Sequence, residues 1–179
     1  MHLIKILSAA SLAAGAVAVD LRFYTSIAGC DGAWFACLDL PPGRCCSSNT
    51  VPASHFLFRN LPPWSVFAAW VGWDCYGERP WLKAGSGHWC IGSEGLEPLW
   101  SGKWTDTMTI PSPGPYRQGL EGRIQTGSAE GCVQPNAFAY NTTEGVERTI
   151  LISESTNVST ILHYYNSQNW EALEALGSD

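Results

Sequence analysis

The chain has 179 residues and carries 10 Lys and Arg against 16 Asp and Glu, a formal net charge of −6. An acidic chain repels phosphate backbones, and no basic run is present to attract an anionic membrane, so we expect no nucleic-acid binding and no membrane-surface binding. Charged residues make up only 15% of the chain whereas Trp occurs 9 times, so we expect a fold dense in aromatic rings. The length is enough for one domain, alone or with an appendage.

Residues 1–18 have the features of a secretory signal peptide. Lys5 supplies a positive charge, an apolar stretch follows, and Ala16-Val17-Ala18 offers the small residues that signal peptidase accepts. The apolar stretch is too short to span a bilayer, which takes roughly 20 helical residues. We therefore expect a secreted, extracellular protein without a membrane span, whose mature chain begins at or near Val19.

Seven cysteines follow the leader, and a secreted chain meets the oxidising conditions in which disulfides form. Their spacing lacks the two close pairs typical of a zinc site, so we expect them to be structural. Cys45 and Cys46 are adjacent and cannot readily bridge each other, so they need different partners, and the spacing leaves the connectivity open. One cysteine is left unpaired or bonds between chains. The framework comprises Cys30, Cys37, Cys45, Cys46, Cys75, Cys90 and Cys132.

Residues 19–109 are predicted to form a cysteine-rich β domain. This part is dense in Gly, Pro, aromatic residues and Cys, and its turn signals are too frequent for a long helix. The fold class that we predict is mainly all-β, a disulfide-stabilised antiparallel β-sandwich. Candidate strands are 21–25, 33–38, 55–59, 65–71 and 88–91.

An internal repeat runs through the same domain. A shift of 45 residues places Cys30 on Cys75 and Cys45 on Cys90. If the repeat is real, one unit of about four strands is duplicated.

The second copy carries an aromatic residue, a Gly and a later Ser, namely Trp70, Gly77 and Ser101. This pattern resembles the Greek-key motif of βγ-crystallins, and the likeness implies two Greek-key-like repeats with Gly32 and Gly77 at equivalent places. The aromatic start and the Cys-rich turns are also similar in style to small secreted cysteine-rich proteins of filamentous fungi, many of which resemble killer toxins or effectors.

Three prolines in residues 110–119 predict a Pro/Gly-rich linker. Residues 120–179 are expected to form a C-terminal β extension with a terminal helix. Its hairpin strands are placed at 146–152 and 158–164. Ser167 is expected to cap the helix, whose apolar face carries Trp170, Leu173 and Leu176.

Asn141 and Asn157 each begin an N-x-Ser/Thr sequon in this polar segment. Glycans are added to such sequons only during export. We expect at least one of the two to be glycosylated.

Two sets of residues have the types that catalysis uses. Asp74, Ser86 and His88 are the residue types of an acyl-transfer triad, but the Gly-x-Ser-x-Gly elbow is absent. Glu94 and Glu97 could be a glycosidase pair, yet two acids three apart in a loop do not fix the separation that such chemistry needs. We therefore predict no catalytic residues.

The crystallin resemblance implies calcium sites in the turns 48–54 and 95–101. The first offers an amide and hydroxyls without a carboxylate, and the second departs further from the pattern. Because Ca²⁺ prefers formally negative oxygen ligands, we expect no metal, and no cofactor motif is present.

Seven of the nine tryptophans lie between residues 64 and 104. One interpretation is that large rings fill the core, and the apolar character of both faces of 64–70 favours it. The other is that exposed rings form a contact surface on which a ligand stacks. The candidate contact aromatics are Trp73, Trp81, Trp100 and Trp104.

These features favour a secreted, non-enzymatic protein that acts by extracellular binding, effector-like or toxin-like, on a protein or glycan ligand. A glycan-binding module is one alternative, since the tryptophans suit it equally. A glycan-acting hydrolase that uses Glu94 and Glu97 is the other.

Overall fold

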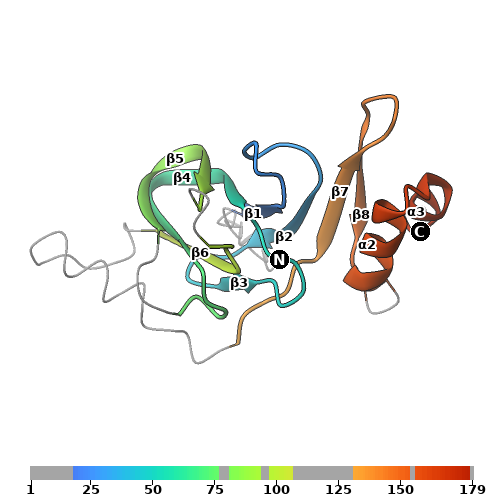
Figure 1. The fold of residues 1–179 in the computed structure, drawn as a ribbon. Helices are drawn as coiled ribbons and strands as arrows, with labels where there is room; N and C mark the ends of the chain where they lie inside the picture. The colour runs from blue at the N-terminus through green and yellow to red at the C-terminus, as the bar shows by residue number, and fades with distance from the viewer. Residues whose placement is uncertain (1–17, 77–80, 94–96, 107–130, 154–155, 178–179) are drawn as a thin grey trace, which may run out of the picture.

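The computed structural model describes residues 18–76, 81–93, 97–106, 131–153 and 156–177. Every pair of strands in these ranges is antiparallel, which confirms the predicted all-β fold (Figure 1). The elements are β1 (Val19–Tyr24), β2 (Trp34–Leu40), β3 (Cys45–Ser47), β4 (His55–Trp70), β5 (Trp81–Gly92), β6 (Ser101–Asp106), β7 (Ala137–Asn141), β8 (Glu147–Leu151), α2 (Val158–Asn166) and α3 (Trp170–Ala175).

Strand β4 is continuous where two strands, 55–59 and 65–71, were predicted. Its middle bends sharply, because Asn60 and Trp64 have φ angles of 62° and 66° and the register against β5 shifts on both sides of Leu61. Bulges of this kind redirect a strand without ending it. The long β4–β5 hairpin therefore runs through both layers of the sandwich, as its curved course in Figure 1 shows.

The pairing registers repeat along the chain, as a duplicated unit requires. Asp20 lies opposite Arg59 between β1 and β4, and Val66 lies opposite Thr105 between β4 and β6, so both partners have moved 46 positions along the chain. The same shift carries the β1–β2 pair Arg22 and Ala36 onto the β4–β5 pair Ala68 and Leu82. The strand repeat is thus one residue longer than the 45-residue shift of the cysteines.

Each repeat donates its third strand to the layer of the other. In the first repeat β3 pairs with β6, and in the second the end of β5 pairs with the start of β4. One layer is therefore β2–β1–β4–β5 and the other β5–β4–β6–β3, joined because β4 and β5 belong to both. This is the double Greek-key sandwich that the sequence predicted, although Gly77 lies outside the described residues.

The disulfides follow the same symmetry. Six cysteines form three disulfides, Cys30–Cys90, Cys37–Cys46 and Cys45–Cys75. The counterpart of Cys30 in the other repeat is Cys75, and the counterpart of Cys90 is Cys45. The Cys30–Cys90 and Cys45–Cys75 disulfides are therefore equivalent bonds. Disulfide bonding is therefore as predicted, with Cys45 and Cys46 bonded to different partners.

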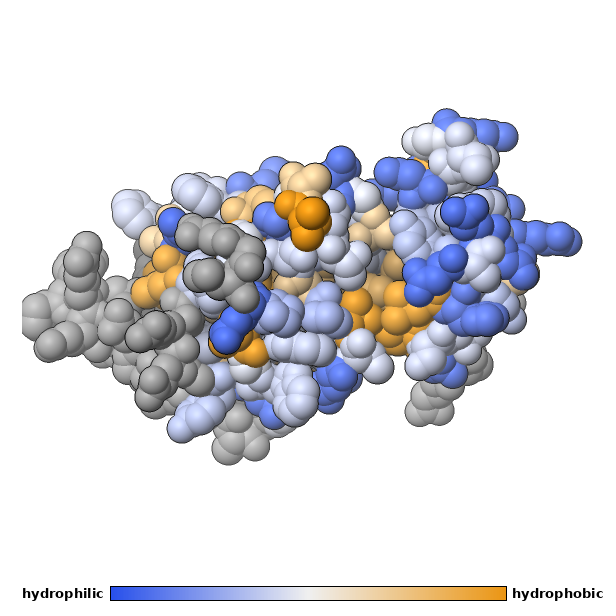
Figure 2. Space-filling model, viewed as in Figure 1, coloured by the Kyte–Doolittle hydropathy of each residue, from blue (hydrophilic) through white to orange (hydrophobic). Residues whose placement is uncertain are grey.

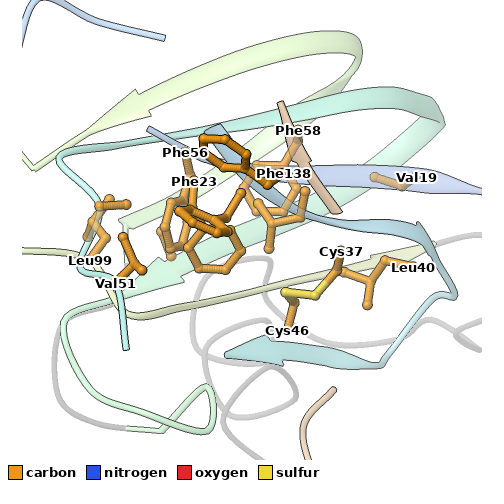
Figure 3. Close-up of a cluster of buried hydrophobic side chains, with 14 of the residues drawn as sticks. Val19, Phe23, Cys37, Leu40, Cys46, Val51, Phe56, Phe58, Leu99 and Phe138 are labelled. Carbon is orange, nitrogen blue, oxygen red and sulfur yellow. A yellow bond between two sulfur atoms is a disulfide. The ribbon is translucent and has the colours of Figure 1, made fainter. Parts of the chain in front are cut away.

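The core lies between the two layers. Figure 3 shows Phe23 and Phe56 gathered there, with the Cys37–Cys46 disulfide at one end. Gly102 in β6 lies so close to the opposite layer that a Cβ atom would come within 2.6 Å of Leu21 Cδ2. The side chains that fill this core come from both repeats, and include Leu21, Phe23, Phe35, Phe56, Phe58, Phe67 and Trp104.

The C-terminal segment extends the first layer, because β7 pairs with the free edge of β2 and β8 follows it. Figure 2 shows hydrophobic side chains gathered where this segment meets the rest of the molecule. The partly buried residues of the segment that pack against the core are Ile152, Val158, Leu162, Tyr164, Tyr165, Trp170 and Leu176. Residues 110–119, the predicted linker, lie outside the described ranges.

Two predictions for this segment were wrong. Residues 158–164 form helix α2 in place of a strand, since Asn157 accepts a hydrogen bond from Thr160 N at 2.8 Å as its N-cap. Ser167 ends α2, and Asn169 is the N-cap of α3. Within the described ranges, no helix is both long and apolar enough to cross a membrane.

Candidate functional site

The candidate site, which we call the aromatic surface, is made by two exposed rings of one turn, Trp73 and Tyr76, and by the half-buried ring of Trp100. Trp73 is 58% exposed and Tyr76 is 72% exposed, both in the turn that follows β4. The half-buried Trp100 packs edge-on against Trp73, with ring centroids 5.8 Å apart. Exposed rings in contact present apolar area that a ligand can cover.

The turn that carries Trp73 and Tyr76 is held by a disulfide and by hydrogen bonds. Cys75 is buried and bonded to Cys45, which ties the turn to β3. The hydroxyl of Ser101 accepts a hydrogen bond from Cys75 N at 2.9 Å and donates one to the Gly72 carbonyl at 2.7 Å. Ser101 is fully buried, so water cannot replace its hydroxyl in these bonds.

The same turn contains unfavourable backbone. Asp74 and Cys75 have φ angles of 63° and 53°, in the left-handed region that residues with a side chain seldom adopt. A Cβ atom at Gly72 would overlap the Tyr76 carbonyl oxygen, so this position requires glycine. Such conformations persist only where surrounding bonds enforce them, and they concentrate at functional sites.

The first repeat has a counterpart to this turn. Shifting by 46 positions places Ile27 on Trp73 and His55 on Ser101, in the registers that relate the strands. His55 Nδ1 lies 3.1 Å from the Ser26 carbonyl, the equivalent of the Ser101–Gly72 bond. Ile27 is 90% exposed. The two repeats therefore display one large apolar side chain each from equivalent turns, and only the second displays aromatic rings there.

The remaining tryptophans have other roles. Trp104, predicted as a contact residue, is only 2% exposed and donates from Nε1 to the Leu40 carbonyl at 2.8 Å, so that prediction is corrected to a core role. Trp81 is half-buried against the core. Trp64 and Trp89 are exposed and were missed from the sequence, where nothing distinguishes them from core rings. Trp89 lies across Gly85 and donates to the Ser86 carbonyl.

Cys132 is in none of the disulfides, and its sulfur belongs to a cluster of three with Cys45 and Cys75, all within 4.8 Å of one another. Burial, together with a hydrogen bond to the Asp74 carboxylate, raises the pKa of the Cys132 thiol to about 12. Lys103 on β6 faces the same group, and burial lowers the pKa of its ammonium. Two of the three sulfurs are already bonded to each other, so the cluster offers no set of three thiolates for a metal ion.

Comparison with known proteins identifies the family. A family model called ARB_05566_N, described as an N-terminal domain, matches residues 20–144. The chain belongs to this family. The matched range contains both Greek-key repeats, the aromatic surface and Cys132, whereas α2 and α3 lie beyond it. No curated protein and no solved structure matches the chain.

Within the described ranges, the residues of the two candidate catalytic sets have different hydrogen-bond partners or are exposed. Asp74 donates from its backbone N to Ser47 Oγ beside the sulfur cluster, whereas His88 accepts from Asn60 N at the bend of β4. Ser86 is exposed in β5. Glu97 is exposed, and Glu94 lies outside the described residues.

The turn 48–54 is used for packing. Val51 and Ala53 are buried in the core, and Ser48 Oγ accepts a hydrogen bond from Val51 N. Ser54 Oγ donates to the Thr25 carbonyl. These bonds involve two of the hydroxyls that the crystallin resemblance assigns to calcium.

Arg22, Trp34 and Glu147 form a group of polar contacts on the outer face of the first layer. The Arg22 guanidinium stacks on the Trp34 ring at 3.8 Å, and Trp34 Nε1 donates to Glu147 on β8. Burial raises the pKa of the neighbouring Tyr24 hydroxyl, against the opposing effect of Arg22. These contacts attach the β7–β8 hairpin to the sandwich, which gives the group a structural role.

Proposed function

We propose that this chain is a secreted, non-enzymatic protein that acts by binding an extracellular ligand through the aromatic surface, in an effector-like or toxin-like manner. The observation that carries the proposal is the exposure of Trp73 and Tyr76 on a turn fixed by a disulfide and by Ser101. A surface that is already ordered loses little conformational entropy on binding, so more of its contact energy appears as affinity.

A glycan is the ligand chemistry that suits this surface best. Sugar rings present flat apolar faces with hydroxyl edges, and exposed indole and phenol rings offer stacking faces with polar tips. The net charge of −6 disfavours polyanionic ligands, and the exposed Asp74, which lies in the same turn as Trp73 and Tyr76, places a further negative charge beside the aromatic surface. A neutral glycan therefore fits the surface better than an acidic one.

Replacing Trp73 with Ala tests the proposal. We expect the variant to bind a glycan array about tenfold more weakly than the unaltered protein, because truncating a central aromatic contact costs on the order of 1–2 kcal/mol of binding free energy. Trp100→Ala should show a similar loss, since its ring supports that of Trp73.

Ile27→Ala is the matched control, because it removes the exposed side chain from the equivalent turn of the other repeat. It should leave glycan binding unchanged. Equal binding by Trp73→Ala and the unaltered protein would overturn the role of the aromatic surface. If the unaltered protein binds no neutral glycan, the glycan is refuted as the ligand, and binding to a protein ligand is tested next.

Export is the second part of the proposal. Expressed in a eukaryotic secretory host, the protein should appear in the medium with its N-terminus at or near Val19, which is the first residue of β1. Asn141 and Asn157 are both exposed, and Asn157 caps α2 through Oδ1, which leaves Nδ2 for a glycan. Intact-mass measurement before and after enzymatic deglycosylation checks both features, and retention in the cell with residues 1–18 still attached would contradict them.

A further inference from the structure

The three-sulfur cluster is held together by backbone pairing. Cys46 and Val133 form a parallel bridge, in which Val133 N donates to the Cys45 carbonyl at 2.9 Å and Ser47 N donates to the Val133 carbonyl at 2.9 Å. The residues one position earlier on each segment, Cys45 and Cys132, therefore lie side by side. Neighbouring strands lie about 4.8 Å apart, which is within the Cα separation that a disulfide spans.

We propose that Cys132 is an internal exchange partner for the Cys45–Cys75 disulfide, so that the protein has two disulfide isomers. In this step the Cys132 thiolate attacks Cys45 Sγ, a Cys45–Cys132 bond forms, and the Cys45–Cys75 bond breaks. Cys75 leaves as a thiolate and takes up the proton that Cys132 gave up. The number of disulfides is unchanged, so no oxidant or reductant is consumed.

Cys45 is the sulfur attacked because it shares the backbone register of Cys132. Cys75 lies on the separate turn after β4. Its φ angle of 53° and the hydrogen bond from its backbone N to Ser101 Oγ hold it in place. Attack at Cys45 needs only side-chain rotation within the paired segments. A Cys75–Cys132 bond would instead pull that turn away from Ser101.

The groups around Cys132 set the rate of exchange. Asp74 stabilises the thiol form, while Arg44 and Lys103 favour the thiolate more weakly. The attacking species is the thiolate. As long as the pH is below the pKa of the thiol, the thiolate population rises about tenfold for each unit by which the pH is raised. Exchange should therefore be slow near neutrality and faster under alkaline conditions.

Exchange would release the disulfide that ties the turn carrying Trp73 and Tyr76 to β3. The chemistry depends on the sulfurs alone, whereas its effect on ligand binding rests on the proposed function. Two separate readouts therefore distinguish a failure of the exchange from a failure of the binding proposal.

The experiment locates the free thiol. The secreted protein is incubated at increasing alkaline pH, quenched in acid, treated with N-ethylmaleimide in denaturant, deglycosylated and digested with trypsin. Cys75 and Cys132 fall in different tryptic peptides, each as its single cysteine, so mass spectrometry separates them. We expect the label on Cys132 at the start, then a growing fraction on Cys75, at a rate that rises about tenfold per pH unit.

Two variants sharpen the test. Asp74→Asn should speed the transfer of label, because it removes the carboxylate that opposes thiolate formation, and Asn tolerates the left-handed backbone at this position as well as Asp does. Cys75→Ser should contain no reactive thiol, because Cys45 and Cys132 then pair. Label that stays on Cys132 at every pH, label that moves to Cys45 in place of Cys75, or two free thiols in Cys75→Ser would each overturn the proposal.

If label moves to Cys75 and glycan binding weakens in proportion, both proposals are supported. If label moves while binding of the unaltered protein is undiminished, exchange stands and the contribution of the tied turn to binding is refuted.

Discussion

Trp104→Ala is expected to lower the free energy of unfolding by about 3–5 kcal/mol, the range typical of deleting a large ring from a packed core. Trp104 is 2% exposed in the layer that faces Phe56 and Phe58, and its indole N–H satisfies the buried Leu40 carbonyl. Truncation removes the packing and leaves that carbonyl without its donor. Urea unfolding followed by far-ultraviolet circular dichroism measures the loss without relying on tryptophan fluorescence.

The duplication supplies a second arm to this experiment. Phe58 is the counterpart of Trp104 in the first repeat, and Phe58→Ala should cost a similar amount, about 3–5 kcal/mol. Trp73→Ala, by contrast, should change stability by less than about 1 kcal/mol because its ring is mostly exposed. A loss below about 1 kcal/mol in Trp104→Ala would show that its ring does not fill the core.

Much of the β-fold could be predicted because strand patterning is local. Alternating apolar residues place β1 and β2 within a few residues of their observed bounds, and the Cys spacing reveals the duplication. The bend inside β4 could not be predicted in the same way. The Pro-Pro pair at 62–63 indicates that the strand ends there. The strand continues past this pair because β4 pairs with β5 on both sides of it.

The error at α2 has a different cause. Its β-branched and aromatic residues favour a strand by composition. The positions that pack inward, Val158, Ile161, Leu162 and Tyr165, nevertheless recur at helical spacing, and Asn157 precedes them as an N-cap. Spacing was the better guide than residue type, because the packing face decides which element a segment forms.

The candidate site was predictable only in part. A dense run of tryptophans indicates that some serve the core and some the surface, yet local sequence does not separate the exposed Trp73 from the buried Trp104. Whether a ring is buried or exposed depends on which layer it faces, and hence on pairings between distant strands. The sulfur cluster is equally non-local, since the bridge between Cys46 and Val133 brings Cys132 beside Cys45, 87 positions earlier in the chain.

Comparing the repeats indicates where the second has diverged. The equivalent turns contain equivalent disulfide-bonded cysteines, Cys30 and Cys75. A side chain at the start of the fourth strand of each repeat closes its turn, His55 of β4 in the first and Ser101 of β6 in the second. His55 makes one contact to its turn, whereas Ser101 makes two. The turn with the aromatic rings is therefore the more tightly closed of the two, which is what a preordered contact surface requires.

Ser101→Ala should accordingly lower the free energy of unfolding by about 2–3 kcal/mol, because it leaves the Cys75 N–H and the Gly72 carbonyl without their partner. Chemical denaturation measures the total cost. Hydrogen exchange at the Cys75 amide reports the local effect, and this amide should exchange faster in the variant even under conditions where the core stays protected.

His55→Ala is the matched variant in the first repeat, and it should cost less because a single contact to Ser26 is lost. Glycan binding separates the two variants further. Ser101→Ala should weaken binding, since the turn must then be ordered by the ligand, whereas His55→Ala should leave binding unchanged. Equal stability losses with equal effects on binding would mean that the closure of the second turn is not what prepares the aromatic surface.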